Sequence, residues 1–428
     1  MPVKFRPEAL ALGSVMMALS GLPCGWLMAA QRPDGLSLAS GDKKPFLVIM
    51  VDTKQSVFTT TTETVSSWIF PSTTNCYTMQ DWIGVNFGGR VGILPCNDTC
   101  DTADDGVVKV AVDSTDPTVE VPGALESICK TALLKAAPYI DFSRYDKAKT
   151  RKIRPDQLGI VFLFANPDLL GGATSFGFYE IPEPRLNGVQ IDGFEFVSAA
   201  PSRDNIGAII HEWIHLCGES DFYACDQTRY GVNNLHLGYI WKGDLKGRNG
   251  PSNLMPLSME NFGIVKPEVV SRPGEYELRA RSTGKYNYLK IPTADLDEYF
   301  LLENRQFDGF DDCIANDVSV PGIAIYHVDR KQQRKDNFNN DDRNHRLVTI
   351  EAANEATCGY NEYNMTNGFD SADHNVLWHQ DLVFGPATVP GTSLYSGKAS
   401  GISITVTSRN GSVMKVRVGL EKQRARPL

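Results

Sequence analysis

Two histidines four residues apart, with a glutamate directly after the first, are the residues whose types and spacing can do chemistry. They are His211, Glu212 and His215, in the stretch IIHEWIHLCGESD. In an α-helix, residues four apart lie one above the other on the same face, so both imidazoles can bind one metal ion. The pattern predicts a zinc site in which Glu212 lies beside the ion without binding it. From there Glu212 can carry a proton from an activated water to a leaving amine.

The residues after this helix are expected to supply a third protein ligand. Gly218 can adopt a left-handed conformation that ends the helix and turns the chain, which would bring Asp221 back to the ion. Three protein ligands leave the fourth position open, as in catalytic zinc sites. The alternative is that Asp221 lies behind the ligands and that a later glutamate, such as Glu298 or Glu303, binds instead.

The elements that must position these residues alternate strands and helices in the first half of the chain. Continuous apolar runs at 46–51 and 159–165 predict strands buried on both faces. Apolar residues at helical spacing predict a helix over 124–137. We expect the site helix to run over 205–217, capped by Asp204.

The pattern of apolar and polar residues changes after residue 270. Short strand-like segments, separated by Gly, Asn, Asp and Pro, predict a mostly β region; they are 275–280, 299–303, 322–328, 347–351, 402–407 and 413–418. The expected fold class is therefore α+β. It comprises a catalytic α/β domain over 31–270 and a β-rich C-terminal domain, packed on it, over 271–428. A strand at 193–198 is the expected edge strand for an extended substrate.

The first thirty residues have the layout of a secretory signal peptide. Lys4 and Arg6 precede an uncharged apolar stretch that ends in Met28-Ala29-Ala30. We therefore expect residues 1–30 to be cleaved and the protein to be secreted, with no stable membrane association afterwards. The alternatives are an uncleaved membrane anchor, since the stretch is long enough to span a bilayer, and lipid modification of Cys24.

The cysteine count agrees with export. Of the nine cysteines, eight remain once Cys24 is removed with the signal, and an even set is typical of disulfide bonds in an oxidising compartment. Close spacing favours bonds between Cys96 and Cys100 and between Cys217 and Cys225. The alternative is a set of unrelated buried thiols.

The charge of the chain excludes one class of partner. With a net charge of −9 and no basic run longer than a pair of residues, the chain lacks the electrostatic footprint of a nucleic-acid-binding protein. Two acidic clusters can bind Ca²⁺ in a loop; they are Asp308, Asp311 and Asp312, and Asp341 with Asp342. Their spacing matches no defined calcium loop, so a solvated acidic surface is expected there.

Residues 211–221 resemble the immune inhibitor A family of secreted metallopeptidases, whose motif is His-Glu-x-x-His-x-x-Gly-x-x-Asp. Every fixed position of that motif is matched, and the resemblance covers roughly residues 45 to 420. It implies a metzincin-like catalytic domain with one catalytic Zn²⁺ bound by His211, His215 and Asp221. It also implies that Glu212 is the general base and acid, and that the substrates are proteins or peptides.

The chain departs from the family pattern near the motif. Glu219-Ser220 stands where the family often has Leu-Pro, and Gly238 falls where the methionine below the metal is expected, with Met255 as an alternative. The predicted function is a secreted zinc endopeptidase. The rival hypotheses are a catalytically inactive relative that serves as an extracellular binding module, and a zinc hydrolase that acts on a non-peptide substrate.

Overall fold

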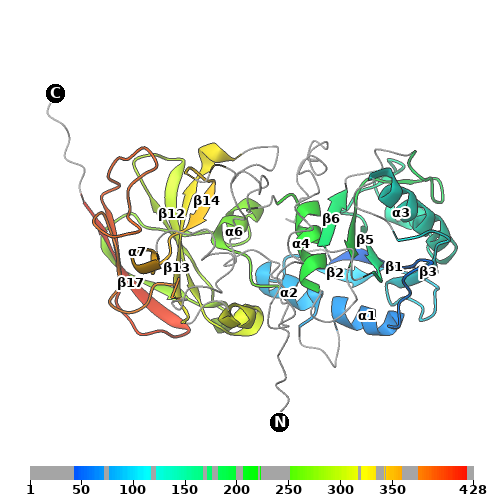
Figure 1. Cartoon of the computed structure of the whole chain (residues 1–428), viewed down its shortest axis with the longest axis horizontal. Coiled ribbons are helices and arrows are strands. Elements are labelled where there is room, and N and C mark those ends of the chain that lie inside the picture. Colours follow the sequence, from blue (N-terminus) through cyan, green and yellow to red (C-terminus); the bar gives the residue numbers. More distant parts are fainter. Residues whose placement is uncertain are drawn as a thin grey trace, which may run out of the picture.

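The first half of the chain is built on a six-stranded sheet, seen on the right of Figure 1. Its strands are β1 (Lys43–Asp52), β2 (Gly92–Pro95), β3 (Val107–Ala111), β5 (Gly159–Phe164), β6 (Gly171–Ser175) and β8 (Phe194–Ser198). β1 pairs in parallel with β2, β3 and β5, and β5 pairs in parallel with β8. β6 runs antiparallel to β8 and ends the sheet in the described part of the chain.

The computed structural model describes residues 43–71, 77–116, 122–166, 171–175, 182–198, 206–219, 222, 251–316, 320–333, 342, 344–358 and 375–421. The expected signal peptide therefore lies outside the described residues, as do Asp204, Asp221 and Gly238. Within the described ranges, no helix has the length and apolar character needed to cross a membrane.

The side chains of β1 alternate between two cores, which is why its apolar run is continuous. All residues from 46 to 51 are fully buried. Ile49 lies in the core under α3 (Pro122–Ala136), and Val48 lies in the core on the opposite face of the sheet. The helices on that second face are α1 (Thr62–Ile69), α2 (Met79–Asn86) and α4 (Ile206–Leu216).

Two stacked sheets form the second half, on the left of Figure 1. The strands of the first, in spatial order, are β14 (Val348–Ile350), β13 (Gly322–Asp329), β12 (Glu298–Arg305), β11 (Leu289–Pro292) and β9 (Glu268–Val269). Those of the second are β10 (Gly274–Arg279), β17 (Val413–Leu420), β16 (Ile402–Val406) and β15 (Val383–Phe384). Phe300 on β12 lies in a core shared with the second sheet, while its neighbour Leu301 faces the first half of the chain.

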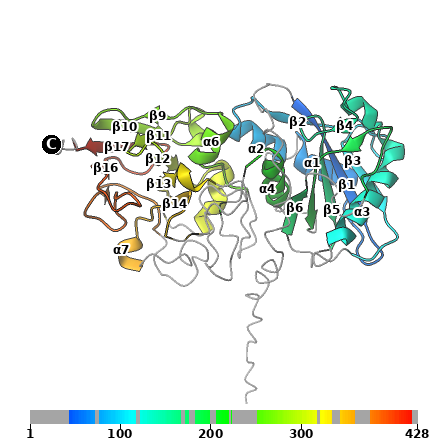
Figure 2. The ribbon, with the colours of Figure 1, turned by 90° about the horizontal axis from the view of Figure 1, so that it is seen from above.

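The remaining elements are short. They are α6 (Pro256–Phe262), α7 (Glu355–Cys358), the paired strands β4 (Lys152–Ile153) and β7 (Gln190–Ile191), and the 3₁₀ helices 137–139, 142–145, 281–283, 309–316 and 330–332. α6 contacts β12 and lies between the two halves in both Figure 1 and Figure 2. Pro256 at its first turn and Gly263 in the left-handed conformation just past its end set its limits.

The structure confirms the α+β class and the elements predicted around the candidate site. β1, β5, α3 and α4 fall where the apolar patterns place them, and the region after residue 270 is mostly β. One expectation is wrong. The strand at 193–198 is β8, which lies between β5 and β6 and is not an edge; in the described sheet that position belongs to β6.

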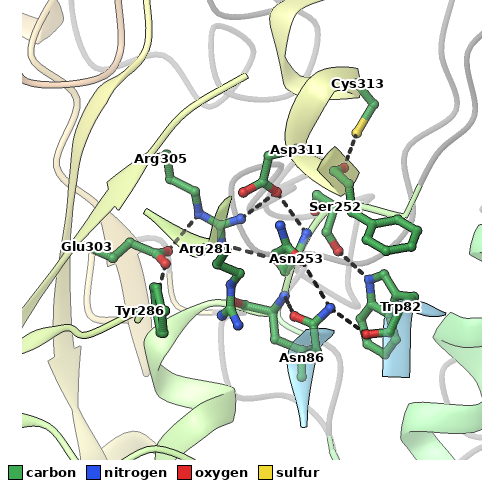
Figure 3. Close-up of polar contacts among 12 residues, drawn as sticks. Trp82, Asn86, Ser252, Asn253, Arg281, Tyr286, Glu303, Arg305, Asp311 and Cys313 are labelled. Atoms are coloured by element: carbon green, nitrogen blue, oxygen red, sulfur yellow. Dashed lines mark hydrogen bonds and ion pairs between the residues drawn. The ribbon is translucent and has the colours of Figure 1, made fainter. Parts of the chain in front are cut away.

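Residues 251–255, which we call the crossover segment, connect the two halves through buried polar contacts (Figure 3). The side chain of Asn86 on α2 donates to Asn253 Oδ1 at 3.1 Å and accepts from the backbone N–H of Leu254 at 2.8 Å. Because a buried amide must find partners for both ends, this pairing fixes the segment against α2. Apolar residues of both halves share one core around it.

From the second half, the side chain of Arg305 holds the same segment (Figure 3). Its guanidinium donates to Glu303 Oε1 and Asp311 Oδ1, each at 2.8 Å, and to the carbonyl of Asn253 at 3.1 Å. Burial alone would lower the pKa of Arg305, but Asp311 and Glu303 outweigh it and raise the pKa. The guanidinium therefore stays charged inside the protein and compensates both carboxylates.

We expect Arg305→Met to destabilise the protein by about 3–5 kcal/mol, because it leaves two buried carboxylates without their counter-charge. The measurement is chemical denaturation of both proteins. Arg279→Met is the matched control, because its ion pair with Glu277 is partly exposed to solvent and surface pairs contribute about 0–1 kcal/mol. Equal losses for the two variants would contradict a structural role for the buried cluster.

Candidate metal site

α4 is the helix that carries the candidate ligands, and it is buried on every side. It contacts β8 and β6 of the sheet. On another side, the ring of Trp213 meets Phe87 edge-on at 5.7 Å between centroids, and Phe87 in turn contacts Phe262 of α6 at 5.5 Å. A helix that is apolar all round is stable only when enclosed in this way. Gly218, with φ of 96°, ends it as predicted.

The structure brings the two histidines of the motif together. Their Nε2 atoms lie 3.1 Å apart, and the rings are nearly perpendicular with centroids 4.6 Å apart. Two nitrogens that bind one tetrahedral zinc ion are separated by roughly 3.3 Å. His211 and His215 therefore present their Nε2 atoms at a spacing that suits a shared ion, as expected from residues one helical turn apart.

A backbone contact determines which nitrogen of His215 is available. Its Nδ1 lies 2.9 Å from the carbonyl oxygen of Glu219. A carbonyl only accepts hydrogen bonds, so Nδ1 donates and the neutral ring keeps the lone pair of Nε2 for a ligand. This is the arrangement by which metal-binding histidines are usually oriented.

Glu212 lies beside the histidine pair, with Oε1 3.9 Å from His211 Nε2. The carboxylate is buried but is on the same side as the imidazole nitrogens, where it can reach a molecule bound next to them. The three residues of the predicted chemistry are thus assembled at one place.

The third ligand is the part of the prediction that the structure does not address, because Asp221 lies outside the described residues. Among the residues that the structure does describe, no group of three His, Cys, Asp or Glu side chains could hold a metal ion. The two alternative glutamates have other partners. Glu298 pairs with His327 at 2.9 Å, and Glu303 accepts from Arg305 and Tyr286.

Glu195 on β8 is a residue of this region that the sequence analysis missed. It pairs in register with Val161, whose side chain lies in the core on the α4 side of the sheet. The carboxyl group is fully buried, and neither oxygen has a hydrogen-bond partner. Burial raises the pKa of Glu195 well above its ordinary range, and the charge of Glu212 raises it further. A lone acid in the apolar strand sequence FEFV is the signal that could have found it.

We expect the Glu195→Gln variant to fold. Its free energy of unfolding should increase relative to that of the unmodified protein as the pH rises. The raised pKa means that the folded protein keeps a proton which the unfolded chain loses above about pH 4.5, so stability falls with rising pH. Glutamine removes this dependence. Unfolding free energies of chelator-treated protein at pH 5 and pH 8 test this, with exposed Glu268→Gln as the control. A constant difference between Glu195→Gln and the unmodified protein would contradict it.

His327 belongs to a separate buried cluster in the second half. Nε2 contacts Glu298 and Nδ1 contacts Glu351 at 3.3 Å. The ring of Tyr395 stacks on it at 4.5 Å and also on His345 at 4.3 Å. Burial lowers the pKa of His327, but the two glutamates prevail and raise it to about 9.

The stability of the protein should therefore fall as the pH rises through about 9. The raised pKa of His327 contributes stability that is complete below about pH 6.5, the ordinary histidine value, and is lost as the folded imidazolium loses its proton. Denaturation between pH 6 and pH 10 measures this. His327→Gln should flatten the alkaline part of the profile, whereas an unchanged slope would show that other groups cause it.

Two further expectations need correction. The acidic cluster at 308–312 is not simply a solvated surface, because Asp311 is buried and bound to Arg305.

The expected bond between Cys96 and Cys100 is not present, because both are buried free thiols. Their turn is held by Asp98, whose carboxylate accepts from two backbone N–H groups at 3.0 Å. Cys217 is also a buried free thiol.

No family model matches the chain, and no curated protein sequence matches it with significant similarity. The assignment of a function therefore depends on the geometry of the described residues and on the motif.

Proposed function

We propose that this protein is a secreted zinc-dependent endopeptidase with a metzincin-like catalytic domain. The observation that carries the proposal is the convergence of His211 Nε2 and His215 Nε2 at 3.1 Å, with the Glu212 carboxylate beside them. Asp221 is the proposed third ligand, and the fixed residues of the motif support it. The apolar N-terminal segment supports export.

Each residue has a defined part in peptide hydrolysis. When bound, zinc polarises the scissile carbonyl and makes a water nucleophilic near neutral pH. His211 and His215 orient the site through Nε2, and the hydrogen bond from His215 Nδ1 to Glu219 keeps its ring in the required tautomer. Glu212 accepts the proton of the attacking water and delivers it to the leaving amine.

The proposed place for the substrate is the edge of the sheet next to α4. β6 ends the described sheet, runs antiparallel to β8 and contacts α4. An extended peptide can add to such an edge by backbone hydrogen bonds, which would lay it along the site helix. This placement of the substrate on β6 replaces the one expected on 193–198.

The test combines metal analysis with a protease assay. The purified protein should contain stoichiometric zinc and should cleave casein in a chelator-sensitive manner. Glu212→Ala should lower the rate by about 10²–10⁴-fold while zinc is retained, because it removes only the proton carrier. His211→Ala should lose the metal.

The possible outcomes separate the rival functions. Protein without zinc would be an inactive binding module. Zinc-loaded protein that leaves casein and other polypeptides intact would be a hydrolase of non-peptide substrates. Either result would overturn the endopeptidase proposal.

A further inference from the structure

A chain of hydrogen bonds leads from the ring of His215 into the second half of the molecule. It begins with Glu219, whose carbonyl accepts from His215 Nδ1 at 2.9 Å. The carboxylate of the same residue accepts from Asn261 Nδ2, at 2.9 Å to Oε1 and 3.2 Å to Oε2. Glu219 is therefore held at its side chain while its backbone orients the imidazole.

Asn261, near the end of α6, is held in turn by Arg330. Nη1 of the guanidinium donates to Asn261 Oδ1 at 2.6 Å. Arg330 follows β13 directly, and it also donates to Glu260 Oε2 at 3.1 Å and to the hydroxyl of Tyr299 at 2.8 Å. These partners lie on α6 and β12, so the guanidinium has a fixed position relative to the second half.

We infer that Asn261 and Arg330 are positioning residues for His215, through which the β-rich half sets the orientation of a metal ligand in the first half. The inference rests on the proposed zinc site. Partners behind a metal ligand fix its ring and tautomer, and their loss typically weakens metal binding by about 10–100-fold.

The experiment measures zinc affinity by competition with a chromogenic chelator, together with the visible absorption spectrum of the Co²⁺-substituted protein. Asn261→Leu should weaken zinc binding by about tenfold and shift the cobalt bands. Arg330 is one hydrogen bond further from His215 than Asn261 is, so Arg330→Met should weaken zinc binding only several-fold.

The matched control is Lys290→Met. Lys290 binds the other oxygen of Glu260 at 3.0 Å and stacks on Tyr299, so its loss disturbs the same cluster without a contact to Asn261. This variant should keep the zinc affinity and cobalt spectrum of the unmodified protein. General damage to the cluster would instead affect Lys290→Met and Arg330→Met alike, and that result would overturn the inference.

A double substitution tests the route through Glu219. In a Glu219→Leu background, Asn261→Leu should have no further effect on zinc affinity, because its partner is already gone. Additive effects, or wild-type affinity and cobalt spectra in all single variants, would overturn the inference while leaving the zinc site intact. Failure of the unmodified protein to bind zinc would instead refute the proposed function, and the inference with it.

Discussion

The rest of the candidate site depends on the close approach of two imidazole nitrogens, His211 Nε2 and His215 Nε2, which lie 3.1 Å apart. The lone pair of His215 Nε2 faces His211 Nε2, and this distance suits either an N–H donated by His211 or a cation bound by both nitrogens. The rings keep this approach because α4 is enclosed on all sides and because the carbonyl of Glu219 fixes the ring of His215. The apolar enclosure therefore holds both side chains, and the hydrogen bond holds that of His215.

The enclosure of α4 is shared between distant parts of the chain. The sheet contacts α4 through β6 and β8, and Phe87, directly after α2, packs against both Trp213 of α4 and Phe262 of α6. Because α6 also packs on β12, the helix with the histidines is supported by both halves. The buried contacts of Arg305 and Asn86 with the crossover segment hold these elements in fixed positions relative to one another. The β-rich half is thus part of the scaffold of the site.

Periodicity and spacing were enough to predict the α+β class, the doubly buried strands, the site helix and the convergence of His211 and His215. These features follow from local sequence, because apolar runs and the helical repeat fix which side chains share a face. The network of Asn261, Arg330 and Glu219 could not be predicted, since it joins residues far apart in the chain. Glu195 was missed for a different reason: its burial depends on which face of β8 meets α4.

The crossover segment also has a consequence for the order in which the molecule can be completed during synthesis. The indole N–H of Trp82 donates to the carbonyl of Ser252, Asn86 pairs with Asn253 and Leu254, and Arg305 donates in turn to the carbonyl of Asn253. A nascent chain synthesised only as far as the motif therefore contains the two histidines. It still lacks α6, which helps to enclose α4 and carries the side chain that holds Glu219. The 84 residues that lead from the end of the motif at Asp221 to Arg305 must be synthesised before the first half can make all of these contacts.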